Sequence, residues 1–182
     1  MFKQSIILIL FLLISCSDQT DNTTQEQTTK DVAKVIEKVE PKKPSQPMAF
    51  IKTTDGSSLI IPEAMFDTDA AKEFLATGKN IYVGDAEAIK MGKKRYNLWS
   101  CTQCHGPTAK GQVGPGLTGP DFRYPKDATN KGMFETIWAG TNGGMGAKGF
   151  GLMTADDGVT PDELLKIIAF IRSNGSITGN EE

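Results

Sequence analysis

Three side chains near the middle of the chain could hold a metal-containing cofactor covalently. The segment reads Cys101-Thr102-Gln103-Cys104-His105, and Cys-x-x-Cys-His is the attachment signature of c-type haem. The spacing has a chemical reason: at the end of a helix the two thiols reach the two vinyl groups of one porphyrin, and the adjacent imidazole stands over the iron. A chance match in a chain of this size is on the order of one in a thousand by average residue usage. We therefore predict one covalent haem c on Cys101 and Cys104, with His105 as the proximal iron ligand.

Two other chemistries use paired cysteines, and the surrounding sequence favours neither. A thioredoxin-type dithiol precedes a helix in a βαβ setting, whereas this motif follows a helical pattern. A zinc site here would need a fourth ligand, which an acidic residue would have to supply.

The residue counts exclude further functions. The chain has 182 residues, 3 Cys and 1 His, and its formal net charge is −2. Because His105 is the one histidine, two-histidine zinc sites and bis-His ligation of iron are impossible. The net charge argues against a broad basic surface, so we expect no nucleic-acid partner.

The sixth iron ligand should come from a loop between the haem motif and the last helix. Methionine is the usual ligand where electron transfer is the task, because it raises the reduction potential. Met145 and Met153 are the candidates, and we favour Met153 because it stands seven residues before Thr160, the expected start of the last helix. An iron that is open or bound by Lys148 is the remaining alternative.

Several elements must position these residues. Two short β-prone runs around Asp55-Gly56 predict a hairpin within residues 50–61. Helical patterns cover residues 67–77, 85–101 and 131–139. The last helix is the clearest, since Thr160-Pro161-Asp162-Glu163 forms a capping box with proline at the first helical position.

Glycine- and proline-rich loops separate these helices, at residues 106–130 and 140–159. So much loop cannot pack a core by itself, and a large apolar haem would fill the middle. We place this haem domain at residues 48–176 and expect residues 177–182 to form a disordered tail.

The first forty-seven residues predict export and a tether. One lysine precedes an apolar run from Ile6 to Ile14, which indicates a signal peptide at residues 1–15. Leu13-Ile14-Ser15-Cys16 resembles the bacterial lipobox, and that resemblance implies a lipid on Cys16. The alternative is an ordinary signal peptide with an incidental cysteine.

Residues 16–47 are polar and charged and predict a disordered tether. The expected location is the periplasmic side of a membrane. The outer membrane is favoured, because Ser17 rather than aspartate follows Cys16.

Further motifs resemble a known family. Gly92-x-x-x-Tyr96 and Phe170 resemble the crossed-helix contact of class I cytochromes c. The following motifs, over about residues 49–175, together resemble the cytochrome c-L family: Tyr82-Val83, Ala109-Lys110-Gly111-Gln112-Val113-Gly114-Pro115-Gly116-Leu117, Tyr124-Pro125-Lys126, Gly132-Met133-Phe134 and Thr160-Pro161-Asp162-Glu163-Leu164-Leu165.

The resemblance implies a mainly α, class I cytochrome c fold wrapped around one covalent haem, with a short N-terminal β-hairpin. It implies that the Pro115 carbonyl contacts the His105 ring and that Leu117, Tyr124 and Trp138 line the haem pocket. Arg123, beside Tyr124, could serve a haem propionate.

By the same resemblance the protein is an electron carrier and not an enzyme. A periplasmic quinoprotein (PQQ-dependent) methanol dehydrogenase would donate single electrons, and a downstream cytochrome or oxidase would accept them. The alternatives are a carrier for another periplasmic dehydrogenase or oxidase, and a haem sensor or enzyme with an open sixth site.

The sequence departs from the family in two places. A Met-Gly-Pro-Met-like segment is replaced by Met145-Gly146-Ala147-Lys148, and the loop before the last helix is longer. Both departures fall where the sixth ligand is expected.

Overall fold

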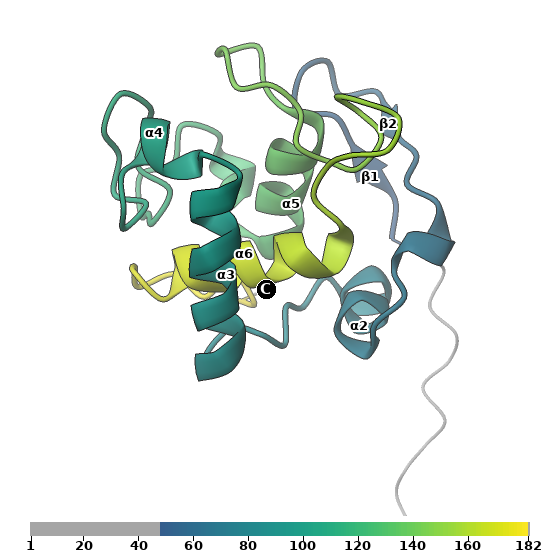
Figure 1. Cartoon of the computed structure of the whole chain (residues 1–182), viewed down its shortest axis with the longest axis horizontal. Coiled ribbons are helices and arrows are strands. Elements are labelled where there is room, and N and C mark those ends of the chain that lie inside the picture. The colour runs from purple at the N-terminus through teal and green to yellow at the C-terminus, as the bar shows by residue number, and fades with distance from the viewer. Residues whose placement is uncertain (1–47, 182) are drawn as a thin grey trace, which may run out of the picture. The chain divides into compact units, whose positions relative to one another are not determined.

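The computed structural model describes residues 48–181, so the predicted signal peptide, Cys16 and the tether lie outside the described part. The fold is mainly helical with one small antiparallel sheet, as expected (Figure 1). Its elements are β1 (Phe50–Ile51), β2 (Ser58–Leu59), η1 (Glu63–Met65), α2 (Asp69–Thr77), α3 (Ala86–Leu98), α4 (Cys101–His105), η2 (Pro125–Ala128), α5 (Asn130–Ala139) and α6 (Pro161–Arg172). No helix within this part is long and apolar enough to cross a membrane.

The crossing of α3 and α6 is the central contact of the fold (Figure 1). Gly92 faces the Lys166 backbone carbonyl so closely that a Cβ would overlap its oxygen. One turn later, the fully buried Tyr96 ring packs against Phe170 at 5.2 Å between ring centroids. The Tyr96 hydroxyl donates to the Gly106 carbonyl at 2.9 Å, so the same crossing also holds the residue that ends α4. The helix contact predicted from Gly92, Tyr96 and Phe170 is therefore confirmed.

The start of α6 also follows the prediction. The Thr160 hydroxyl accepts from the Glu163 backbone N–H, and the Glu163 carboxylate accepts from the Thr160 N–H. Glu163 pairs in addition with Arg95 of α3, at 2.9 Å between Nη2 and Oε1. This capping box therefore fixes both the first turn of α6 and its orientation against α3.

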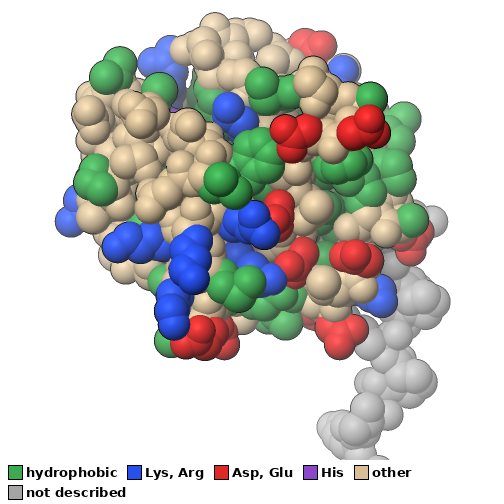
Figure 2. Space-filling view, viewed as in Figure 1, with side chains coloured by type: hydrophobic (Ala, Val, Ile, Leu, Met, Phe, Trp, Pro, Cys, Tyr) green, Lys and Arg blue, Asp and Glu red, His purple; other side chains and the backbone are tan. Residues whose placement is uncertain are grey.

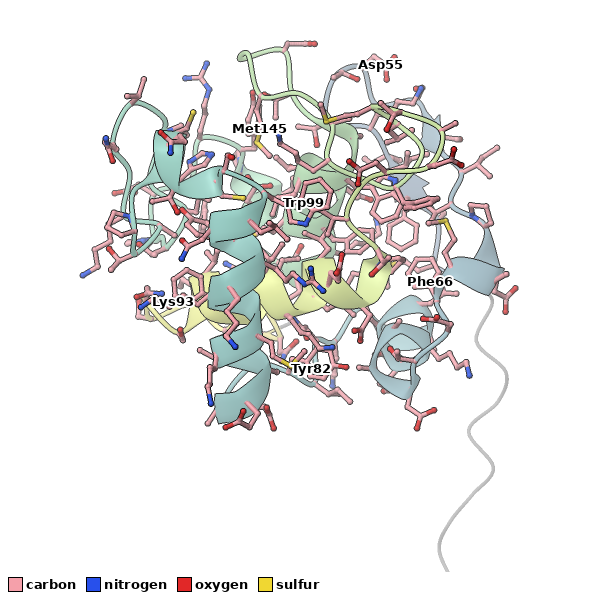
Figure 3. All side chains as sticks on the ribbon, viewed as in Figure 1. Asp55, Phe66, Tyr82, Lys93, Trp99 and Met145 are labelled. Carbon is pink, nitrogen blue, oxygen red and sulfur yellow. The ribbon has the colours of Figure 1, made fainter. Side chains whose placement is uncertain are left out.

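An aromatic cluster fills the side of the domain that holds the hairpin, α2 and α5. The Phe134 ring is at its centre, 5.4 Å from Phe50, 5.0 Å from Phe74 and 5.3 Å from Trp138 between centroids. Phe66, labelled in Figure 3, stacks on Phe50 at 5.9 Å. These rings bury one another and form the apolar core on this side.

Buried polar contacts attach the hairpin to α5. The Ile51 backbone N–H donates to the buried Glu135 carboxylate, which also pairs with Lys126 and Lys131 at 2.8 and 2.9 Å. Because each oxygen of Glu135 has a partner, its burial leaves no charge unpaired.

The helix expected over residues 85–101 is in fact two helices. α3 ends at Leu98, Ser100 adopts a left-handed backbone conformation with φ of 58°, and α4 begins at Cys101. A left-handed residue cannot continue a right-handed helix, so the chain turns here. The Thr102 hydroxyl donates to the Asn97 side chain at 2.7 Å across the break. The haem motif thus has a helix of its own.

The C-terminal segment is more ordered than predicted. The Gly179 carbonyl accepts from the Asn130 backbone N–H at 3.0 Å, at the start of α5. The Asn180 side chain accepts from the Asn80 N–H and donates to the Asn80 carbonyl, at 2.9 and 3.2 Å. Residues 177–181, expected to be disordered, therefore pack against the domain through specific hydrogen bonds.

Candidate haem site

A cavity of about 310 Å³ separates α4 from the loop that follows α5. Its volume is at the lower end of the range, roughly 300–1,000 Å³, that ligand pockets occupy. Three segments form its walls: the junction of α3 and α4, the loop after α4, and the loop after α5. The lining residues are Trp99, Ser100, Cys101, Cys104, His105, Val113, Gly114, Pro115, Gly143, Gly144, Met145, Gly146 and Lys148.

His105 is held in one ring orientation and one tautomer. Its Nδ1 lies 2.8 Å from the Pro115 carbonyl oxygen, so the predicted contact between these residues is present. A carbonyl can only accept, which means that Nδ1 carries a proton, and in the neutral ring Nε2 then keeps its lone pair. A second nitrogen held in this way is the usual support of a metal-binding histidine.

The loop after α4 carries Pro115 to this position through backbone hydrogen bonds. The Gly114 N–H donates to the Cys104 carbonyl at 2.7 Å, and the Leu117 N–H donates to the Ala109 carbonyl at 2.8 Å. A Cβ on Gly114 would lie 3.2 Å from the His105 ring, so glycine allows the loop to approach closely.

The two thiols lie three residues apart on α4, which places them on one face of the helix. Neither is in a disulfide. Burial raises the pKa of the Cys101 thiol to about 11, although the nearby Lys148 ammonium opposes this increase. Reactive dithiols have a lowered pKa, because the thiolate is their nucleophile. The environment of Cys101 therefore disfavours the thioredoxin-type alternative.

Of the two methionines, the structure brings Met145 and not Met153 to the cavity. Met145 is half-buried and lines the wall that faces α4 (Figure 3). Met153 is 61% exposed and is absent from the lining.

The hydrogen bonds of the loop explain this difference between the methionines. The Phe150 N–H donates to the Val159 carbonyl, and the Val159 N–H donates to the Lys148 carbonyl. The segment between these contacts is thus closed at its base and leaves the cavity. The prediction of Met153 rested on its distance in sequence from α6. That distance gives no information about the hydrogen bonds that hold this segment away from the cavity.

The three other predicted pocket residues lie outside this lining. Leu117 is partly buried against the core. Tyr124 lies next to the wall residue Gly143, where its hydroxyl is 3.3 Å from the position of a Cβ, and Arg123 lies over its ring. Trp138 is only 2% exposed and belongs to the aromatic cluster, where its ring contacts Gly149.

Trp99 is a lining residue that the sequence did not single out. Its position two residues before Cys101 was the available signal, but the expected continuous helix concealed its direction. The indole Nε1 is buried and has no hydrogen-bond partner among residues 48–181. A buried donor without an acceptor costs roughly 1–3 kcal/mol, so a group with an acceptor would stabilise this wall.

These residues fit a covalent haem. Two free thiols, an imidazole with a free Nε2 and a thioether from the opposite wall all line one cavity. Gly144 and Gly146 have open space where a Cβ would stand, so the wall beside Met145 offers room. Within residues 48–181, no three side chains of His, Cys, Asp or Glu gather to hold a bare metal ion.

Comparison with known proteins gives a consistent result. The Cytochrome c family model matches residues 89–175. Cytochrome c-L of Methylorubrum extorquens is 38% identical over 132 residues, which are 71% of this chain and 63% of that relative. The chain thus spans less than two thirds of that relative's length.

Two solved structures are also similar. Cytochrome cL of Methylophaga aminisulfidivorans is 39% identical, with a TM-score of 0.59 over 69% of this chain and 79% of that one. Cytochrome cL of Hyphomicrobium denitrificans is 39% identical, with a TM-score of 0.60 over 70% of this chain and 73% of that one.

Proposed function

Since the chain belongs to the cytochrome c-L family, with its covalently bound haem c, we propose that it carries single electrons. The donor is a PQQ-dependent methanol dehydrogenase, and the acceptor is a downstream cytochrome or oxidase. The observation that carries this proposal is the convergence of Cys101, Cys104, His105 and Met145 on one cavity. A carrier of this kind binds no substrate of its own and is not an enzyme.

Four side chains hold the haem in this proposal. Cys101 and Cys104 would form the thioethers, His105 would bind the iron through Nε2, and Met145 would supply the second protein ligand. When bound, the haem supplies reversible one-electron chemistry at iron, and a methionine ligand raises its reduction potential. Met145 replaces Met153 as the favoured ligand, because it alone of the two lines the cavity.

The remaining residues orient these ligands and limit the access of water. The Pro115 carbonyl fixes the His105 ring, and Trp99 closes the wall next to the core. The mouth of the cavity stays open, since Cys104 is exposed and Val113 is 85% exposed. An exposed apolar side chain such as Val113 beside the cavity suits the small interfaces of transient redox partners.

The location belongs to the same proposal. The protein is exported, is lipid-anchored through Cys16 and acts on the periplasmic side of a membrane, with the outer membrane favoured. The apolar run before Cys16 and the lipobox-like sequence support this. Mass spectrometry of the mature N-terminal peptide tests it: a diacylglyceryl mass on Cys16 is expected, and a free thiol there contradicts the anchor.

The test of the electron-transfer step uses purified proteins. Reduced methanol dehydrogenase is mixed with the oxidised full-length cytochrome in a stopped-flow instrument, and the haem absorbance reports each electron received. An unrelated class I cytochrome c serves as the control. We expect faster reduction than in the control. Equal rates would contradict the proposed donor while leaving the haem site intact.

A further inference from the structure

Lys148 holds a position in the cavity wall that the proposed function does not use. Its backbone is fixed at three points: its N–H lies 3.1 Å from the carbonyl oxygens of both Ile137 and Trp138, and its carbonyl accepts from the Val159 N–H at 2.7 Å. These contacts join the end of α5 to the residue before the α6 cap. The side chain of Lys148 therefore starts from a rigid point and lines the cavity beside the thiols and His105.

The ammonium of Lys148 has no carboxylate partner among residues 48–181. Lys126, Lys131 and Lys166, which are also partly buried, each pair with a carboxylate. Lys148 is half-buried and forms no such pair in the described range. The ammonium is close enough to the Cys101 thiol to act on it electrostatically, since it opposes the increase that burial causes in the pKa of this thiol.

A cation in such a place favours added negative charge. Its attraction for a charge several ångströms away is larger beside a low-dielectric cavity than in open water. A haem in this cavity brings two carboxylates, and each reduction of its iron adds one electron. Lys148 would thus stabilise the reduced form relative to the oxidised form.

We propose that Lys148 is a potential-setting residue, whose ammonium lies beside the haem and raises the reduction potential of the iron. The role is distinct from ligation, which the site assigns to Met145 on the same loop. The inference rests on the proposed haem site. It does not depend on which dehydrogenase donates the electron.

The test is a spectroelectrochemical titration of the holoprotein. Lys148→Gln removes the charge, Lys148→Arg retains it, and Lys94→Gln removes a charge from the exposed face of α3, where basic side chains gather in Figure 2. We expect Lys148→Gln to lower the equilibrium constant for reduction about tenfold, which is ~59 mV for a one-electron couple. Lys148→Arg and Lys94→Gln should remain close to wild type.

Salt and the absorption spectrum separate this role from others. The shift in Lys148→Gln should persist at high ionic strength, because salt screens a partly buried charge less than an exposed one. The low-spin spectrum and the sulfur-to-iron charge-transfer band should not change.

Three results would overturn the proposal. An unchanged potential in Lys148→Gln removes its basis. An equal shift in Lys94→Gln would show only a general effect of net charge. A high-spin spectrum in Lys148→Gln would identify Lys148 as a ligand. Failure of the haem site itself is distinguishable, since wild-type protein would then carry no covalent haem by mass spectrometry.

Discussion

The hairpin side and the α4 side of this domain bury apolar surface in different ways. On the hairpin side, stacked rings around Phe134 fill the interior. On the α4 side, glycine-rich loops surround a cavity of about 310 Å³. The first region packs its own rings against one another, whereas in the second a bound haem would supply contacts that the loops do not make. Stability and redox chemistry are therefore assigned to different regions.

Removal of both haem thiols should have the largest effect. In the double variant Cys101→Ala/Cys104→Ala, we expect no covalent haem and a loss of order in the loops around the cavity. Hydrogen exchange should be fast over residues 106–117 and 143–148, while α5 and α6 keep measurable protection. Uniform loss of protection would show that the hairpin side does not hold structure by itself.

Truncation of the central aromatic ring should have the next largest effect. Phe134→Ala should lower the free energy of unfolding by about 3–5 kcal/mol, because it opens a cavity among rings that cannot collapse. Urea denaturation monitored by circular dichroism measures the loss. The haem spectrum below the transition should stay that of wild type, and a changed ligand band would contradict the separation of the two regions.

An added methyl group at the crossing of α3 and α6 should lower the free energy of unfolding by less than the loss of the Phe134 ring. Gly92→Ala places a Cβ against the Lys166 carbonyl and should lower the free energy of unfolding by about 1–3 kcal/mol despite the better helix propensity of alanine. Lys93→Ala, on an exposed position of the same helix, is the matched control. Equal stability of the two variants in urea would argue against a close crossing.

Buried Asp127 gives the hairpin side a pH dependence of its own. Burial raises the pKa of Asp127 to about 6, an effect that the hydrogen bond from Thr136 only partly opposes. Because the folded state binds this proton more tightly than the unfolded state, its contribution is fully present below about pH 4 and is lost as pH rises through about 6. In Asp127→Asn, the change in the free energy of unfolding between pH 4 and pH 8 should be smaller by about 1–2 kcal/mol. Urea denaturation over this pH range measures it. A slope that is unchanged in the variant would exclude Asp127 as its source.

Replacing each methionine with alanine should have the smallest effect on stability, and only one of the two replacements should change the haem spectrum. Met145→Ala should abolish the sulfur-to-iron charge-transfer band and allow carbon monoxide to bind readily, with a loss of only about 1–2 kcal/mol in unfolding free energy. Met153→Ala should change neither property, since this side chain is 61% exposed. The reverse result would restore Met153 as the ligand and would require the 149–159 loop to close over the cavity.

Prediction from the sequence succeeded where the signal was local or periodic. Thr160 and Glu163 identified the start of α6 because a capping box involves residues only three apart. Gly92 and Tyr96 indicated the helix crossing. Glycine inside a helix lowers the stability of that helix, and the close approach of a second helix is a reason to have it there. Ser100 gave no comparable signal, since a left-handed conformation is uncommon for residues other than glycine and no glycine marks the break.

The kind of cofactor chemistry could be inferred from the sequence, because two thiols and an imidazole this close in the chain are also close in space and can hold one porphyrin. Which other side chains complete the site depends on the fold. Hydrogen bonds of Val159 with Lys148 and with Phe150 carry Met153 away from the cavity and leave Met145 in its wall. Packing against Phe134 draws Trp138 into the aromatic cluster. Such choices depend on contacts between residues far apart in the chain, which spacing alone does not encode.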